Sequence, residues 1–429
     1  MDIIPIDLPL DLPAPLWLLK LVLISFFLLH ILFVNFMIGG TFWTVFKRML
    51  GKEDPFWERF ARDIGNTVTV NKSVAIVLGV APLLAISLAY TNFFYPANNI
   101  TVAWWLSIIW MVGLAFISLY IYKYTWDSTK YSLRFKYFWG LLACTIFTIV
   151  PFIFLSNINL MLYPDQWKNI YSFWQAIWVP NVIPRYLHFM NASFAITGFF
   201  AYGYFHFKGK NKVEDEAYYT RAKQLGMKWA LFATILQMIF GVLNYITLPQ
   251  VADSLLVLVL IICAVIFAGI AIYLLMLNLY IEKKINHILI LLTIMVVVSL
   301  MATMRHVIRE NALEEPKKIL ANKTEIYQAR LAAFMKTYSP AGETKVTGEF
   351  IFQEYCTSCH AINKKVVGPP IRYAIDKYKN NRDDMINFVN NPEKINPDYP
   401  VMPKPPISKS EVEMVVDYLL KLGAGTDEK

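Results

Sequence analysis

Long apolar segments fill residues 1–309 of the chain, and short polar segments separate them. Eight of the apolar segments reach the roughly 20 residues that a helix needs to cross a bilayer. They cover about residues 17–46, 73–94, 102–124, 137–162, 183–207, 229–248, 254–281 and 286–308. The pattern predicts an all-α fold whose first part is an eight-span transmembrane helix bundle.

The pattern changes after Arg309. Residues 310–345 are polar and rich in Lys, Glu and Ala, and the stretch Glu315–Tyr338 is typical of a helical connector. Residues 346–429 then mix charged and apolar positions as a small water-soluble domain does. We therefore expect a transmembrane domain, a helical linker and a C-terminal soluble domain, in that order.

The composition supports a membrane protein. Of the 429 residues, 57% are hydrophobic and 17% are charged, whereas soluble domains contain about 25% charged residues. A chain this apolar cannot bury all its hydrophobic side chains in a core surrounded by water. The net charge of +9 comes largely from basic loops between apolar segments, so it does not indicate a nucleic-acid partner.

The loops alternate in charge. Loops after odd-numbered segments contain eighteen Lys and Arg residues, and loops after even-numbered segments contain two. The basic loops are 47–72, 123–136, 208–228 and 282–287, and the others are 95–101, 163–185 and 249–253. Basic loops face the cytoplasm, so both termini are predicted to be periplasmic in a bacterial inner membrane. The N-terminus lacks the basic region and cleavage site of a secretory signal, so we expect the first segment to be retained.

Residues 356–360 read Cys-Thr-Ser-Cys-His. In this motif the two thiols form thioethers with a c-type haem and the histidine binds its iron. A zinc half-site would need a second pair of ligands, and a redox C-x-x-C would need a thioredoxin-like context; neither pattern occurs near Cys356 and Cys359. The sequence predicts a covalent haem c with His360 as iron ligand. Cys144 and Cys263 lie alone in apolar segments and are predicted to be ordinary core residues.

Three further features fall in order around this motif. Residues 366–371 read Val-Val-Gly-Pro-Pro-Ile, residues 399–403 read Tyr-Pro-Val-Met-Pro, and Glu411–Leu422 is an amphipathic helix. With the motif, they make residues 346–423 resemble class I cytochromes c. The resemblance implies that Met402 is the second iron ligand, although it could also be a packing methionine. It also implies that the strip 366–371 backs the haem. The residues of that strip assigned to the cofactor are Gly368 and Pro369. His/Met ligation raises the potential and leaves no open coordination position, as suits an electron relay.

Five other histidines lie within or at the ends of the apolar segments: His30, His188, His206, His287 and His306. His206 and His287 are beside lysines at predicted cytoplasmic ends, where solvation at the interface explains them. His30, His188 and His306 lie toward the predicted outer leaflet. A single buried histidine can simply be hydrogen-bonded, but ionisable groups in a bilayer indicate function. Three such histidines toward one leaflet, on the side of the membrane where the haem c domain is predicted, favour binding of b-type haem.

Two of these histidines occur in segments that resemble subunit I of cytochrome bd oxidase. Residues 30–40 read His-Ile-Leu-Phe-Val-Asn-Phe-Met-Ile-Gly-Gly and are similar to that family's first span. Residues 185–200 begin Arg-Tyr-Leu-His-Phe-Met-Asn and are similar to its fifth span. The likeness covers about residues 15–310 and implies that His30 and His188 are haem b ligands, holding one or two haems. It also implies a second membrane subunit.

The chain departs from that family in three respects. Residues 102–124 contain no carboxylate, and none of the eight segments has one in its interior. The long loop that the family uses for quinol is reduced to residues 249–253. The methionine expected opposite His188 is missing from the seventh segment. His306 is a hypothetical replacement that would pair with His188 on one haem.

Four further polar residues interrupt apolar segments: Lys20, Gln237, Asn244 and Arg305. Such groups can bond haem propionates or a quinone. For Gln237 and Asn244, hydrogen bonds between helices are the simpler explanation.

Three functions fit the sequence. The first is an electron-transfer cytochrome, with no catalytic residue of its own. It would relay electrons between membrane haem b, which exchanges them with the quinone pool or a partner complex, and periplasmic carriers, through haem c. A subunit of a quinol:cytochrome c-type oxidoreductase works in this way. The second is a terminal reductase of O₂ or NO, against which the missing carboxylates count. The third is a membrane anchor that presents a cytochrome c to a periplasmic enzyme.

Overall fold

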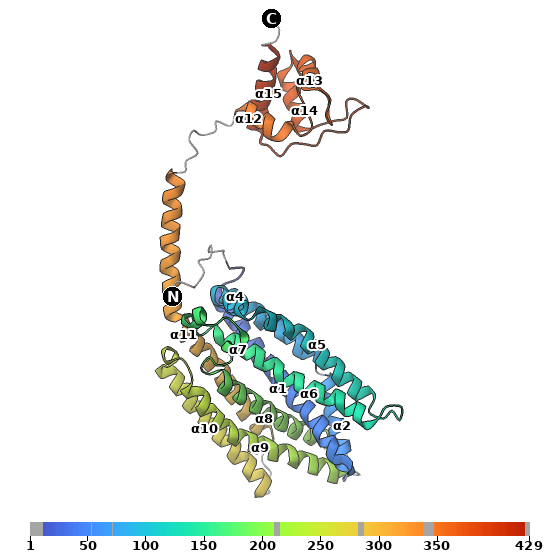
Figure 1. Ribbon diagram of the computed structural model, residues 1–429, viewed down its shortest axis with the longest axis vertical. Helices are drawn as coiled ribbons and strands as arrows, with labels where there is room; N and C mark the ends of the chain where they lie inside the picture. Colours follow the sequence, from blue (N-terminus) through green and yellow to red (C-terminus); the bar gives the residue numbers. More distant parts are fainter. Residues whose placement is uncertain are drawn as a thin grey trace. The chain divides into compact units, whose positions relative to one another are not determined.

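The computed structural model describes residues 12–52, 54–70, 72–209, 215–281, 287–337 and 347–424. Over these residues the chain is helical and contains no β-strand, which confirms the all-α prediction. The chain folds as two compact units, Met1–Glu325 and Ile326–Lys429. Figure 1 shows both units.

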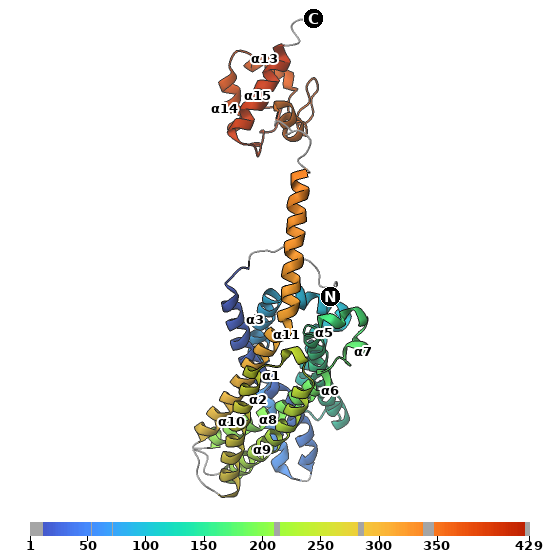
Figure 2. The same ribbon diagram turned by 90° about the vertical axis from the view of Figure 1, so that its left-hand side faces the viewer.

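The first unit is a bundle of long helices joined by short connections (Figures 1 and 2). Its helices are α1 (Leu16–Met49), α2 (Pro55–Val70), α3 (Lys72–Ala89), α4 (Thr91–Ile100), α5 (Val102–Tyr124), α6 (Leu133–Leu160), α7 (Phe173–Ala176), α8 (Val182–Gly209), α9 (Glu216–Ile246), α10 (Leu255–Tyr280) and the start of α11 (His287–Thr337). Short 3₁₀ turns are η1 (Leu50–Lys52), η2 (Pro164–Asn169) and η4 (Gln250–Ala252). Helix α11 continues without a break from the last predicted span into the predicted linker.

The structure confirms the predicted spans only in part. In the described part of the chain, six helices are long and apolar enough to cross a membrane: α1, α5, α6, α9, α10 and α11. Helices α2 and α3 make a seventh candidate if the pair, bent by 45°, is one span. A multi-pass membrane protein is confirmed, but exactly eight spans is not. Helix α8 does not qualify because Arg185, His188 and Asn191 lower its hydropathy, and these residues face the inside of the bundle.

Helix α8 packs along α9 and against α1. Glycines allow α8 and α9 to come into backbone contact. A Cβ on Gly198 would lie 2.5 Å from the amide nitrogen of Ala230, and one on Gly226 would lie 2.7 Å from that of Tyr202. Small residues are typical of such close helix contacts in membranes. The contact holds α8 and α9 in register, and both helices contribute residues to the site described below.

Replacing Gly226 by leucine is therefore expected to destabilise the bundle by about 1–3 kcal/mol, as overpacking commonly does. The larger side chain would meet backbone of α8, which cannot rotate away. Thermal unfolding in detergent measures the effect. Gly113→Leu is the matched control, because a Cβ on Gly113 meets nothing within 4 Å. Equal midpoints for the two variants would contradict this account of the α8–α9 contact.

The predicted loop 47–72 contains a helix that the hydropathy pattern did not indicate. Helix α2 starts at Pro55, a residue that suits the first turn of a helix, and buries Phe60 and Ile64 completely. Its charged face makes ion pairs with other loops, such as Arg59 with Asp215 at 2.8 Å. The basic loops are thus joined to one another by an amphipathic helix.

The second unit is a small helical domain. Its elements are α12 (Gly348–Ile351), a π-helical turn η5 (Phe352–Cys356), α13 (Ile371–Tyr378), α14 (Arg382–Asn390) and α15 (Lys409–Ala424). Helix α15 packs on the other three helices. A Cβ on Gly348 would lie 2.0 Å from the carbonyl oxygen of Met414, so α12 and α15 cross at backbone distance. Arg382 donates to Asp417 at 2.6 and 3.1 Å and lowers the pKa of that carboxyl.

Candidate functional site

The Cys-x-x-Cys-His segment folds as one tight turn that begins at the last residue of η5. The amides of Cys359 and His360 donate to the carbonyl of Cys356 at 3.2 and 2.9 Å. The amides of Val367 and Gly368 donate to the carbonyl of Cys359 at 3.1 and 2.8 Å. The backbone therefore holds both thiols and the imidazole together against the strip 366–371.

The same strip fixes the imidazole of His360. Its Nδ1 lies 2.8 Å from the carbonyl oxygen of Pro369, so Nδ1 carries the proton and donates it. The lone pair of Nε2 is then free for a metal, as is usual for metal-binding histidines. A Cβ on Gly368 would lie 2.3 Å from Cε1 of His360, so this position requires glycine. Gly368 and Pro369, the two residues of this strip assigned to the cofactor, thus contact the histidine predicted to bind iron.

Met402 lies, partly buried, in the segment that joins α14 to α15. Lys365 Nζ is 4.6 Å from the ring centroid of Tyr399. This contact brings the segment that carries Met402 next to the loop that follows His360. The role of Met402 as second iron ligand stays a prediction.

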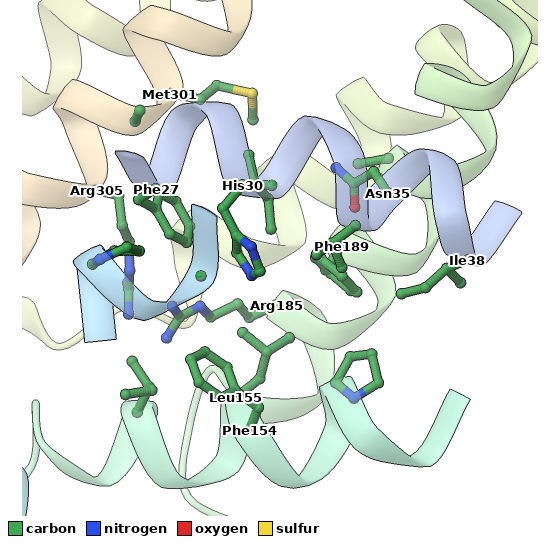
Figure 3. Close-up of a pocket in the computed structure, with 18 of the residues that line it drawn as sticks. Phe27, His30, Asn35, Ile38, Phe154, Leu155, Arg185, Phe189, Met301 and Arg305 are labelled. Atoms are coloured by element: carbon green, nitrogen blue, oxygen red, sulfur yellow. The ribbon is translucent and has the colours of Figure 1, made fainter. Parts of the chain in front are cut away.

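The first unit contains a cavity of about 530 Å³ between its helices (Figure 3). Helices α1, α3, α5, α6, α8, α9 and α11 line it, mostly with apolar side chains. Its polar or charged lining residues are His30, Asn35, Arg185, His188, Gln237, Asn244, Arg305 and Arg309. Among the described residues that line it there is no Asp or Glu. Its volume is within the range of about 300–1,000 Å³ found for ligand and cofactor sites.

His30 projects from α1 into this cavity (Figure 3). Its Nδ1 lies 2.8 Å from the carbonyl oxygen of Ala75 on α3, which leaves Nε2 available. A Cβ on Gly79 would lie 2.7 Å from Cε1 of His30. A carbonyl and a glycine therefore fix this imidazole in the same way as Pro369 and Gly368 fix His360.

His188 lines the same cavity from α8. Its Nδ1 makes no hydrogen bond of ordinary geometry with the described residues. Its carbonyl accepts from Gln237 Nε2 at 3.1 Å, and Gln237 Oε1 accepts from Asn191. Asn244 accepts from Asn181 at 2.8 Å. Gln237 thus bonds α8, as expected, and Asn244 bonds the residue just before α8; both line the cavity as well.

His306 is not among the residues that line the cavity. It lies near Glu310 and Lys317 on its own helix and near Lys20 of α1. Glu310 accepts from Lys20 at 3.2 Å and from Lys317 at 2.8 Å. The structure does not bring His306 and His188 together in this cavity. The pairing of these histidines on one haem, and His306 as an iron ligand, remain predictions that the cavity does not support.

His206 and His287 lie together at the other end of α8. Their ring centroids are 3.6 Å apart, and the hydroxyl of Tyr202 hydrogen-bonds Nδ1 of His287. Neither histidine lines the cavity. These two histidines interact with each other, and they lie outside the lining of the cavity that contains His30 and His188.

The family model of cytochrome c matches residues 346–423. Residues 346–423 are a cytochrome c domain. Such a domain carries a covalent haem c, and Cys356, Cys359 and His360 are the residues of this chain that would hold it. Comparison with curated proteins finds no match to the chain.

The structure of bd oxidase from Geobacillus thermodenitrificans resembles the chain with a TM-score of 0.58. The identity is 13%, and the alignment covers 76% of this chain and 98% of that one. Such a low identity shows the fold alone. The chain is thus a cytochrome c domain fused to a membrane domain with a bd oxidase-like fold. Together the two parts make it a multi-pass membrane cytochrome of electron transfer.

The cavity of this membrane cytochrome has the donor groups that a haem requires. It offers two imidazoles, apolar walls and, on three arginines, N–H groups without a hydrogen-bond partner in the described chain. Gly79 leaves just enough room for His30. The residues present therefore fit a haem b.

Sequence reasoning missed two residues of this site, Arg185 and Arg309. Arg185 belongs to the predicted loop 163–185, and Arg309 is the last residue of the predicted transmembrane domain, one residue beyond the last predicted span. Both stand at the edges of apolar segments, and Arg185 opens the motif that contains His188. A charged residue close in sequence to a proposed haem ligand, as Arg185 is to His188, was the signal that could have identified such residues.

Proposed function

We propose that this protein relays electrons between a haem b in the membrane cavity and the haem c of its cytochrome c domain. One observation carries the proposal: His30 and His188 line a single apolar cavity, and the carbonyl of Ala75 holds His30 with Nε2 unbonded. Imidazoles held in this way are what haem iron needs. A bound haem supplies a one-electron couple.

The residues of the chain then have distinct tasks. Ala75 fixes the tautomer and orientation of His30, and Gly79 makes room for its ring. Gln237 holds the turn of α8 that carries His188. The apolar wall excludes water, which lowers the local dielectric constant around the iron and so tunes its potential.

The proposal includes location and partners. The protein would lie in a bacterial inner membrane with its termini in the periplasm, as the basic loops indicate. Its electrons would come from quinol or a partner complex and pass to a periplasmic carrier or enzyme, or flow in reverse. A second membrane subunit, as in bd oxidases, would complete the assembly.

A terminal reductase of O₂ or NO is the second candidate, favoured by the fold of the membrane domain. It would need a haem with an open coordination position and a supply of protons. The described cavity lining contains no carboxylate that could relay protons, which favours electron transfer.

A pyridine haemochrome assay, which counts b against c haems, and CO difference spectra of the native protein together distinguish the candidates. We expect one haem c per chain and at least one haem b that stays low-spin and does not bind CO. Haem c alone would contradict the relay and support a simple anchor. A high-spin b or d haem that binds CO would support the terminal reductase instead.

A further inference from the structure

Three arginines meet at one end of the membrane cavity. Arg185 comes from α8, and Arg305 and Arg309 lie one turn apart on α11. Figure 3 shows the guanidinium groups of Arg185 and Arg305 in the same part of the cavity, beside His30. The charges of all three arginines act on one another. This end of the cavity is therefore strongly positive.

The arginines have N–H groups without partners. Arg185 Nη1, Arg305 Nε and Nη2, and Arg309 Nε are buried and make no hydrogen bond with the described residues. None of the ion pairs found in the described chain includes these arginines. The neighbouring carboxylate, Glu310, is already bonded to Lys20, Lys317 and Tyr90.

Such an arrangement requires an anion. A buried charge without a counter-charge costs several kcal/mol, and three like charges add their mutual repulsion. Since the described lining contains no Asp or Glu, the negative charge must come from the ligand. The rest of the wall is mostly apolar, so the ligand has a large apolar body and carboxylate or phosphate groups at one end.

We propose that Arg185, Arg305 and Arg309 bind the two propionate carboxylates of the membrane haem and thereby set its orientation. This inference rests on the proposed function. A guanidinium group presents a planar pair of N–H donors that matches a carboxylate. Two propionates on one edge of the macrocycle match a cluster of arginines at one end of a cavity.

The orientation has a consequence for electron transfer. The propionate edge would lie where α11 leaves the cavity, and the same helix continues to Thr337, ten residues before the described cytochrome c domain begins. The positive cluster also favours the reduced haem, because reduction removes a positive charge from its neighbourhood. Removing arginines should therefore lower the potential of haem b.

The variants Arg185→Gln and Arg305→Gln, alone and combined, test the inference on the full chain. The covalent haem c serves as an internal count of folded protein. We expect a lower ratio of haem b to haem c in the double variant, and a lower midpoint potential for any haem b that remains. The lysine variants R185K and R305K, which keep the charge but lose the planar pair of donors, should fall between wild type and glutamine. Arg221→Gln is the control, because Arg221 pairs with Asp54 away from the cavity and should change neither quantity.

The outcomes separate the inference from the proposed function. A wild-type chain with haem c and no haem b would overturn the proposed function. Normal haem b with an unchanged ratio and potential in the double glutamine variant would overturn the propionate assignment alone. Lipid extracted from wild type but absent from that variant, with haem b unaffected, would show that the arginines bind an anionic lipid, and would also overturn the assignment.

Discussion

Replacing Cys356 and Cys359 by serine is expected to remove the covalent haem completely while the membrane haem stays in place. The two thiols supply both thioether bonds, and the imidazole of His360 alone cannot retain the group through denaturation. The two units have separate cores, so the bundle should fold as before. Haem staining after denaturing electrophoresis measures the covalent haem, and reduced-minus-oxidised spectra of the native protein measure haem b.

Cys263→Ser is the matched control for this double variant. Cys263 is a free, partly buried cysteine on α10, far in sequence from the motif. The control should keep the covalent haem in full. Persistent staining in the double variant, or loss of staining in the control, would contradict the assignment of the cytochrome c site.

Removing a membrane ligand is the second change with a large expected effect. His30→Ala and His188→Ala should each abolish or strongly reduce the haem b absorption, normalised to haem c on the same chain. Both side chains line the cavity, and alanine offers no donor to iron. His206→Ala should leave the spectrum unchanged, because His206 lies outside the cavity lining.

A variant that retains the imidazole tests the geometry of His30 more finely. Leucine at Gly79 would occupy the space of the ring, since even a Cβ there lies 2.7 Å from Cε1 of His30. We expect Gly79→Leu to lose haem b much as His30→Ala does, and Gly113→Leu to retain it. Normal haem b in Gly79→Leu would show that the ring position seen here is not the one that binds iron.

The attachment motif for haem c could be predicted because its residues are neighbours in the sequence. Cys356, Cys359 and His360 lie within one turn, so no long-range contact had to be inferred. Long apolar runs also gave good helix positions: the predicted span 102–124 coincides with α5, and 254–281 differs from α10 by one residue at each end. Continuous hydropathy over a bilayer length is a strong signal.

The membrane site depends on contacts that sequence pattern does not encode. His30 is oriented by the carbonyl of Ala75, 45 residues away, and any residue supplies a carbonyl. Arg185 approaches Arg305 because α8 and α11 line one cavity, which hydropathy cannot show. The polar residues that face this interior also lower the hydropathy of α8, so α8 is not among the helices apolar enough to cross a membrane, although the predicted span 183–207 overlaps it.

The central claim is that haem b and haem c exchange electrons, and stopped-flow oxidation tests it directly. Fully reduced protein is mixed with a hydrophilic one-electron oxidant such as ferricyanide, and the two haems are followed at their separate absorption bands. In wild type, haem b should become oxidised together with haem c. In the Cys356→Ser/Cys359→Ser variant, haem b should stay reduced much longer, because its route to the oxidant is missing. Equal rates of haem b oxidation with and without haem c would contradict the relay.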